Sequence, residues 1–215
     1  PINTTATTSS NTYSVTGLDL SSLADGTLTI TADVSDLAGN PATQATDTST
    51  KDTASPTISV AINDGGDGRL NAAEASSVAI SGTTTGVEDG QTVAINISSS
   101  AGGTPINTTA TVNTNSYSLT NLDLSSLADG TLSITADVSD LAGNPATQAT
   151  DTSTKDSAAP SIAISSELSS LAAGETTTLT FSLSESSSNF TESDITVSGG
   201  SLTNFSGSNS FYTAT

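Results

Sequence analysis

The feature that most constrains this chain is a stretch of 56 residues that it contains twice. Residues 1–56 and 105–160 align without a gap at a constant offset of 104 residues, and only nine aligned positions differ. Solenoid repeats recur roughly every 20–50 residues, whereas a β-sandwich domain takes about 100 residues. The period therefore predicts a tandem array of whole domains.

The repeat divides the chain into three predicted parts. Residues 1–56 are predicted to be the C-terminal part of a repeat, 57–160 a complete repeat, and 161–215 the N-terminal part of a divergent domain. A repeat of 104 residues is long enough to bury a core of its own. Because the chain is cut in phase with neither end of a repeat, we expect it to be a segment of a longer protein.

Hydrophobic alternation predicts that the complete repeat is an all-β sandwich. The clearest case is residues 132–138, where Leu132, Ile134, Ala136 and Val138 lie on one side of a strand. Gly, Asn and Asp turns separate the segments. Strands are expected at 57–62, 77–81, 92–98, 108–112, 117–124, 132–138 and 146–153, and in the divergent part at 161–165, 179–183, 195–197 and 211–214.

Composition excludes several functions. The chain has no His, Cys, Met or Trp, which removes most nucleophile–base pairs, thiol chemistry, zinc sites and disulfides, so we expect no enzyme. The formal net charge of −19 argues against a nucleic-acid partner, which requires Lys and Arg to neutralise phosphates. No run of 18 apolar residues is present, so no segment is expected to insert in a membrane. The acidity serves either solubility or the binding of divalent cations.

The strongest candidate metal site is the loop Asn63–Glu74, with the sequence NDGGDGRLNAAE. It follows the pattern of the twelve-residue calcium loop, with Gly68 at the turn position. It departs from that pattern because Asn63 replaces the usual Asp and Gly65 offers no side-chain ligand. The alternative is a Gly-rich surface loop with a short turn. The predicted Ca²⁺ ligands are Asn63, Asp67, the Arg69 carbonyl, Asn71 and Glu74, with Asp64 as a further donor.

The second candidate site is the junction between repeats, where Asp52 and Asp156 each stand four residues before a Pro. The linker is too short to be a free coil, so successive domains are expected to be nearly in contact. In a sandwich with this strand order, the 63–74 loop, the linker and the next domain's Asp-x-Ala-Gly-Asn loop (Asp140 to Asn144) should converge. Three acidic elements would repel each other unless a cation lies among them. The alternatives are that Asp140 and Asn144 only close a turn, and that Lys51 and Lys155 form salt bridges with the adjacent aspartates.

Three stretches carry a resemblance to a known family: residues 67–93, residues 136–144 and the Asp-x-x-x-Pro junctions. They resemble the bacterial Ig-like domains repeated along giant RTX-type, biofilm-associated adhesins of Gram-negative bacteria. Residues 181–207 are similar to another Ig-like type of the same adhesins. The resemblance implies tandem Greek-key Ig-like sandwiches in a secreted, surface-tethered rod, stiffened by interdomain Ca²⁺. The ligands it implies are Asp36, Asp52, Asp140, Asp156 and the acidic loop Asp64–Glu74.

Two functions are consistent with these features. The first is a structural extender that projects an adhesive region from the bacterial cell surface, with neighbouring Ig-like repeats of the same chain as its partners. Near identity between copies favours it, because a spacer needs many copies and no unique site. The alternative is an adhesion module that binds a sugar, a protein or ice. A periodic Thr ladder shared by adjacent strands would favour this alternative, and outward residues such as Ser133 and Thr135 are plentiful.

Overall fold

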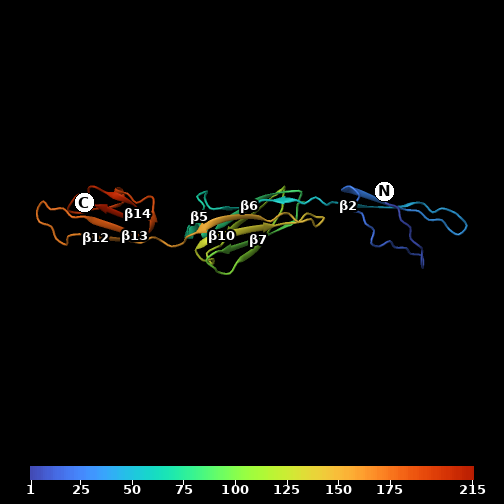
Figure 1. Cartoon of the computed structure of the whole chain (residues 1–215), viewed down its shortest axis with the longest axis horizontal. Helices are drawn as coiled ribbons and strands as arrows, with labels where there is room; N and C mark the ends of the chain where they lie inside the picture. The colour runs from blue at the N-terminus through green and yellow to red at the C-terminus, as the bar shows by residue number, and fades with distance from the viewer. The chain divides into compact units, whose positions relative to one another are not determined.

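The structure is a computed structural model that describes residues 1–215. It is almost entirely β, as predicted, and forms two compact units, Pro1–Asp156 and Ser157–Thr215, which are described separately (Figure 1). The predicted division at 56 and 160 stays a prediction. No helix is long and apolar enough to cross a membrane.

The complete repeat forms all seven expected strands, within a few residues of their predicted ends. The first is broken into two short pieces that both pair with the same neighbour. The strands are β3 (Thr57–Ile58), β4 (Ala61–Asn63), β6 (Val78–Thr85), β7 (Thr92–Ser99), β8 (Ile106–Thr111), β9 (Ser116–Leu122), β10 (Gly130–Asp137) and β11 (Ala149–Lys155).

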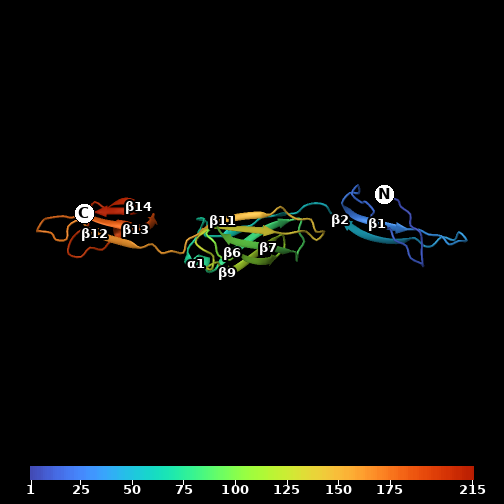
Figure 2. The same cartoon turned by 60° about the horizontal axis from the view of Figure 1, so that its bottom comes forward.

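These strands form two sheets that enclose one core (Figures 1 and 2). One sheet has β3 and β4 on one side of β6 and β9 on the other; the second has the order β5-β11-β10-β7-β8. Alternate residues of β7 and β10 point inward, as the pattern predicted, and Ile95, Ile97, Leu132 and Ile134 are all buried. Such alternation is typical of a sandwich whose outer faces contact water.

Two elements of this repeat were not predicted. After β4 the chain crosses to the other sheet, where β5 (Arg69–Leu70) pairs in parallel with the end of β11. A one-turn helix, α1 (Ala72–Ala75), then returns the chain to β6. The predicted calcium loop is therefore the connection by which the chain passes between the two sheets.

A tyrosine ties the first strand to β9. The hydroxyl of Tyr117 donates a 2.6 Å hydrogen bond to the carbonyl oxygen of Ser59, in the break between β3 and β4. Gly82 makes room for this contact, because a Cβ there would collide with both the Ser59 oxygen and the Tyr117 hydroxyl. Burial raises the pKa of Tyr117 to about 12.

The first copy, residues 1–56, forms only a two-stranded hairpin of β1 (Gly26–Ala32) and β2 (Ala45–Lys51), shown in Figure 2. Its register repeats that of β10 and β11 residue for residue. The segments that correspond to β8 and β9 are not strands here. In the complete repeat those strands pair with β7 and β6, and the first copy has no such partner.

The second unit is a three-stranded sheet of β12 (Ile162–Ser166), β13 (Leu179–Ser187) and β14 (Ser206–Ala214), with a 3₁₀ turn at Glu192–Asp194. Its core is an aromatic cluster in which Phe190 meets Tyr212 edge to face, with ring centroids 5.0 Å apart. The predicted strand at 195–197 is wrong: the segment is irregular, and Ile195 packs against the cluster.

Candidate metal and junction sites

The predicted calcium loop is ordered by hydrogen bonds within itself. Asn71 caps α1: its side-chain oxygen accepts from the amides of Ala73 and Glu74, at 2.9 and 3.0 Å. Glu74 returns the contact by accepting the Asn71 amide at 2.9 Å. This reciprocal pair is a capping box, and it uses two of the residues that sequence reasoning assigned to Ca²⁺.

The remaining carboxylates of the loop each accept a nearby backbone amide. Asp64 accepts from Gly66 and Asp67 from Arg69, as Asn63 accepts from Gly65. Gly68 takes a φ of 76°, the left-handed conformation that the turn position requires. No group of three or more acidic side chains is gathered closely enough to hold a metal ion. The loop residues alone therefore do not form a cation cage.

The loop contacts the end of its repeat, as predicted. The amide of Asp156 donates to the carbonyl oxygen of Leu70 at 2.9 Å, and the amide of Thr154 donates to that of Gly68 at 3.0 Å. This parallel pairing fixes the 63–74 loop beside the point where the chain leaves the sandwich. Leu70 is buried and anchors the loop in the core.

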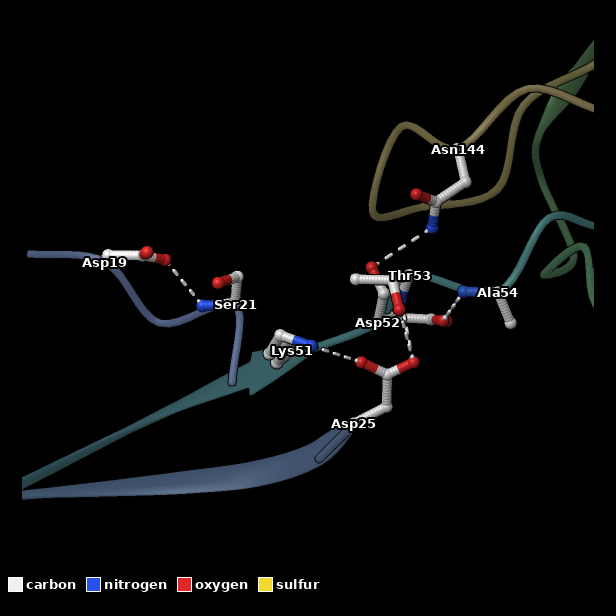
Figure 3. A network of polar contacts seen from close by, with 8 residues as sticks. All are labelled: Asp19, Ser21, Asp25, Lys51, Asp52, Thr53, Ala54 and Asn144. Atoms are coloured by element: carbon white, nitrogen blue, oxygen red, sulfur yellow. Dashed lines mark hydrogen bonds and ion pairs between the residues drawn. The ribbon is translucent and has the colours of Figure 1, made fainter. Parts of the chain in front are cut away.

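The Asp140–Asn144 turn meets the preceding linker, which is the second predicted convergence. The two carboxylate oxygens of Asp140 accept the backbone and side-chain nitrogens of Asn144, both at 2.8 Å. The Asn144 side chain also donates to the carbonyl oxygen of Asp52 at 3.2 Å, as Figure 3 shows. Glu88 reaches the same turn and accepts the Leu141 amide at 2.8 Å.

The contact between turn and linker is a direct hydrogen bond. A side-chain N–H of Asn144 is the donor, and the carbonyl oxygen of Asp52 is the acceptor. Asp140 is nearly fully buried, and its hydrogen bonds to Asn144 hold the pKa of its carboxyl below the usual value. The turn thus closes on itself, and its Asn144 side chain bonds to the linker.

The first copy contains the same turn in a solvent-exposed setting. Asp36 accepts the backbone and side-chain nitrogens of Asn40 at 2.8 Å each, so its local geometry matches that of Asp140. These bonds lower the pKa of Asp36 too, with the Asn40 side chain as the main cause. In both copies the hydrogen bonds of the turn join residues four positions apart, so the turn geometry is local. In the second copy the turn also contacts the linker.

Sequence reasoning missed the partner of the junction lysines. Lys51 does not pair with the adjacent Asp52; its amine lies 2.8 Å from Asp25, which precedes β1. Asp25 also accepts the amide and hydroxyl of Thr53, at 3.0 and 2.8 Å (Figure 3). These contacts, led by Lys51, hold the pKa of Asp25 at about 2. Lys155 pairs with Asp129 at 2.7 Å in the same way, and it is buried.

Comparison with known proteins assigns the family. A sequence model of the bacterial Ig-like domain matches residues 156–215. The chain is also 32% identical to a bacterial immunoglobulin-like domain from the M. primoryensis ice-binding adhesin, over 48% of this chain and 100% of that domain, with a TM-score of 0.33. The chain belongs to the bacterial Ig-like domain family.

Two longer structures are also similar to this Ig-like chain. One is a tetra-tandem repeat from the extending region of a large adhesion protein, at 34% identity over 85% of this chain and 45% of that one, with a TM-score of 0.48. The other is a Ca²⁺-stabilized adhesin with which an Antarctic bacterium binds ice, at 29% identity over 73% and 40%, with a TM-score of 0.36. The chain thus spans less than half of each. No curated protein matches the chain.

Proposed function

We propose that the chain is an extender segment of a large bacterial surface adhesin, a rod of Ig-like repeats that holds an adhesive region away from the cell. The observation that carries this is that each of the two linkers is hydrogen-bonded to a folded element beside it. Asp156 bonds to the loop of its own repeat through Leu70, and Asp52 bonds to the turn of the following repeat through Asn144. A linker held in this way suits a spacer. A secreted RTX-type adhesin of a biofilm is the setting that the sequence resemblance suggests.

The domain division belongs to the same proposal. Residues 1–56 are the second part of one repeat, 57–160 a complete repeat and 161–215 the first part of a divergent one. The hairpin β1–β2 supports this division, because its register is that of β10–β11. Neighbouring Ig-like repeats are then the partners of each unit.

We also propose that Ca²⁺ stiffens the junctions. The ligands would be Asp52 and Asp156 of the linkers, Asp36 and Asp140 of the turns with Asn144, and the acidic loop Asn63–Glu74, including Asp64, Asp67, Arg69 and Asn71. Net acidity and the contact of the loop with Asp156 support this proposal. Since neither the loop nor the turn forms a cage by itself, an ion would need groups from two adjacent repeats. Bound Ca²⁺ would neutralise carboxylates that otherwise repel one another.

The calcium proposal is tested by thermal unfolding of the chain in millimolar Ca²⁺ and in chelator. Binding to the folded state alone raises the melting temperature progressively with calcium concentration. Asp67→Asn with Glu74→Gln should remove this shift if the loop supplies ligands, whereas Asp33→Asn, just past the exposed strand β1, should not. The absence of any shift at millimolar Ca²⁺ would reject calcium and leave an ion-free spacer. Small-angle scattering of an array with more copies should change from flexible to extended on adding Ca²⁺.

A second candidate function has one structural observation in its favour. The outer face of the β8-β7-β10-β11 sheet carries a ladder of small polar side chains. Across one row, Asn107, Asn96, Thr135 and Thr150 lie in register, and in the next, Ser98, Ser133 and Thr152. The hairpin β1–β2 repeats the Thr pairs. Such a ladder could bind a regular partner such as ice or a glycan.

This alternative is separated from the first by direct binding. The chain is tested for incorporation into growing ice and for retention on a glycan array, together with Thr135→Lys and Thr152→Lys variants. Binding that both substitutions abolish would favour an adhesion module. Exclusion from ice together with no glycan retention would leave the spacer as the function. Sheet twist would explain this result, because a twisted sheet does not present flat rows of side chains.

A further inference from the structure

Strand β8 lies at the edge of the larger sheet of the complete repeat and has a partner on one side only. It pairs with β7 without a shift of register. Just after β8, the amide of Val112 donates to the carbonyl oxygen of Gln91 at 2.9 Å, and this bond shows which residues face β7. Because the direction of the backbone groups alternates along a strand, Asn107, Thr109 and Thr111 direct their N–H and C=O groups away from β7. We call these backbone groups the free edge.

The other edges of the complete repeat are protected in the ways that natural sheets use. One edge strand of the smaller sheet is broken into β3 and β4. The other, β9, has a shifted register with β6 and contains Asn121 at a φ of 57°. The edge of β11 is covered at one end by β5, and Asp151 within it accepts the amide of Ile62. Strand β8 has no such feature and contains no charged residue or proline, so a further strand fits beside it.

The part of the repeat around β8 is also uncharged. Residues 90–122, which include all of β7, β8 and β9, contain no Asp, Glu, Lys or Arg, although the chain has a net charge of −19. In the larger sheet, Asp137 lies in the same row as Thr109 but two strands away, with Ala94 between them. Acidic copies of one chain repel each other. The side formed by β8 is therefore the one on which two copies approach each other with least repulsion.

We propose that β8 pairs in antiparallel fashion with β8 of a second copy of this chain, so that the two larger sheets join into one. The free edge is symmetric about Thr109. When Thr109 lies opposite its counterpart, Asn107 of each copy lies opposite Thr111 of the other, and each free N–H meets a free C=O. This arrangement is an isologous, two-fold contact.

The remaining charges do not oppose this contact. The Asp137 residues of the two copies are separated by five strand spacings, which is about 24 Å. Repulsion between them is largely screened at physiological salt, where the Debye length is about 8 Å. The backbone bonds of the free edge thus form between surfaces that carry no charge of their own.

One such contact is weak, and repetition strengthens it. Strand β8 has six residues, so the contact is far smaller than the roughly 1,200–2,000 Å² buried in stable complexes. The β8 sequence also occurs, unchanged, at residues 2–7 of the first copy. Two antiparallel arrays with this constant period align many free edges at once, and such multivalency raises affinity by about 10²–10⁴. This step rests on the extender proposal, whereas pairing of a single β8 does not. An extender of this kind binds its own kind along its sides.

The first test is disulfide trapping in the full chain, which has no cysteine of its own. Opposite Cα atoms of a hydrogen-bonded antiparallel pair are about 5.5 Å apart, a distance that a disulfide spans. We expect Thr109→Cys chains at millimolar concentration, with chelator, to become disulfide-linked dimers on mild oxidation. Ser133→Cys, at an equally exposed position of β10, is the matched control and should stay monomeric. Equal dimer formation by both variants, or by neither, would overturn the proposal.

Sedimentation velocity of the full chain, also in chelator, tests the contact without cysteine. We expect concentration-dependent dimerisation that is lost in Thr109→Pro, which removes an outward N–H that an edge strand can lose without unfolding. Thr109→Asp should abolish it too, because like charges then lie opposite each other. Ser133→Asp adds the same charge away from the edge and should leave dimerisation unchanged, with circular dichroism confirming the fold of each variant.

Two results of sedimentation would refute the pairing. The first is a chain that stays monomeric at millimolar concentration. The second is a dimer that survives both Thr109→Pro and Thr109→Asp, because another surface would then form the contact. Either result would leave the extender and calcium proposals untouched, since calcium is absent and one complete repeat supplies the whole free edge.

Discussion

The two copies allow one substitution to be made twice in nearly the same sequence. Ile134 and Ile30 occupy equivalent positions in β10 and β1, but the first is fully buried and the second is about half exposed. Replacing a buried Ile by Ala removes its transfer free energy and leaves a cavity, which together cost about 2–5 kcal/mol. Replacing an exposed residue outside a packed core changes stability by about 0.5 kcal/mol or less.

We therefore expect Ile134→Ala to lower the free energy of unfolding of the complete repeat by about 2–5 kcal/mol, and Ile30→Ala to leave it nearly unchanged. Urea denaturation followed by circular dichroism measures both, and an unchanged slope with denaturant confirms that stability rather than compactness has altered. For a domain of about 100 residues, the Ile134 variant should melt at least ~8 °C lower.

Two outcomes would refute this reasoning. Equal losses for the two variants would mean that residues 1–56 bury Ile30 in solution. A loss below about 1 kcal/mol for Ile134→Ala would mean that the sandwich does not close over β10. The control is an outward position of the same strand, at which the two copies already differ, with Ser133 in one and Thr29 in the other. Ser133→Ala should therefore be neutral.

Further predictions concern polar groups. Tyr117→Phe should destabilise the complete repeat by about 1–3 kcal/mol in urea denaturation, since the Ser59 carbonyl loses its donor, whereas Tyr13→Phe should have no effect. Because folding raises the Tyr117 pKa from 10.0 to about 12, its contribution is complete below pH 10 and is lost as pH rises through 12; phenolate absorbance would follow this. The Asp25 pKa is lowered from 3.8 to about 2, so its contribution is present above pH 4 and is lost as pH falls towards 2; Lys51→Met should raise that pKa in a carboxyl NMR titration. Thr84→Val should stabilise the repeat by about 1 kcal/mol, because the buried Thr84 hydroxyl has no partner.

The strands of the complete repeat could be predicted because each buries one face, so alternation reports them directly. The two-residue strand β5 could not be predicted, because it forms by pairing with the edge of β11, which is far away in the sequence, and not through a pattern in its own residues. The strand predicted at residues 195–197 did not form for a related reason. Their apolar side chains suggested a strand, but the aromatic cluster of the second unit recruits Ile195 from an irregular segment.

The 63–74 loop shows why a site is harder to predict than a strand. An Asn and a Glu three residues apart fit the last positions of a calcium loop, and they also fit a capping box. In the structure Asn71 and Glu74 form the capping box, and their binding of Ca²⁺ stays a prediction. The residue types and their spacing fit both interpretations, so the sequence alone does not choose between them. The partner of Lys51 was equally hidden, because Asp25 is 26 residues away and reaches it only through the hairpin register.

The junction has two parts, the turn itself and its contact with the linker, and the two copies allow them to be compared. Asp36 and Asp140 make the same bonds to Asn40 and Asn144, so the turn forms whether or not anything docks on it. In the second copy, Asn144 also donates to the Asp52 carbonyl, and Asp140 is buried. A turn that is formed in advance loses little conformational entropy when the linker arrives, and this favours docking of each new repeat in an array. The contact joins Asp52 of one copy to Asn144 of the next, and residues 57–160 contain the equivalents of both, Asp156 and Asn144. An array of such repeats is therefore expected to form the same contact at each junction.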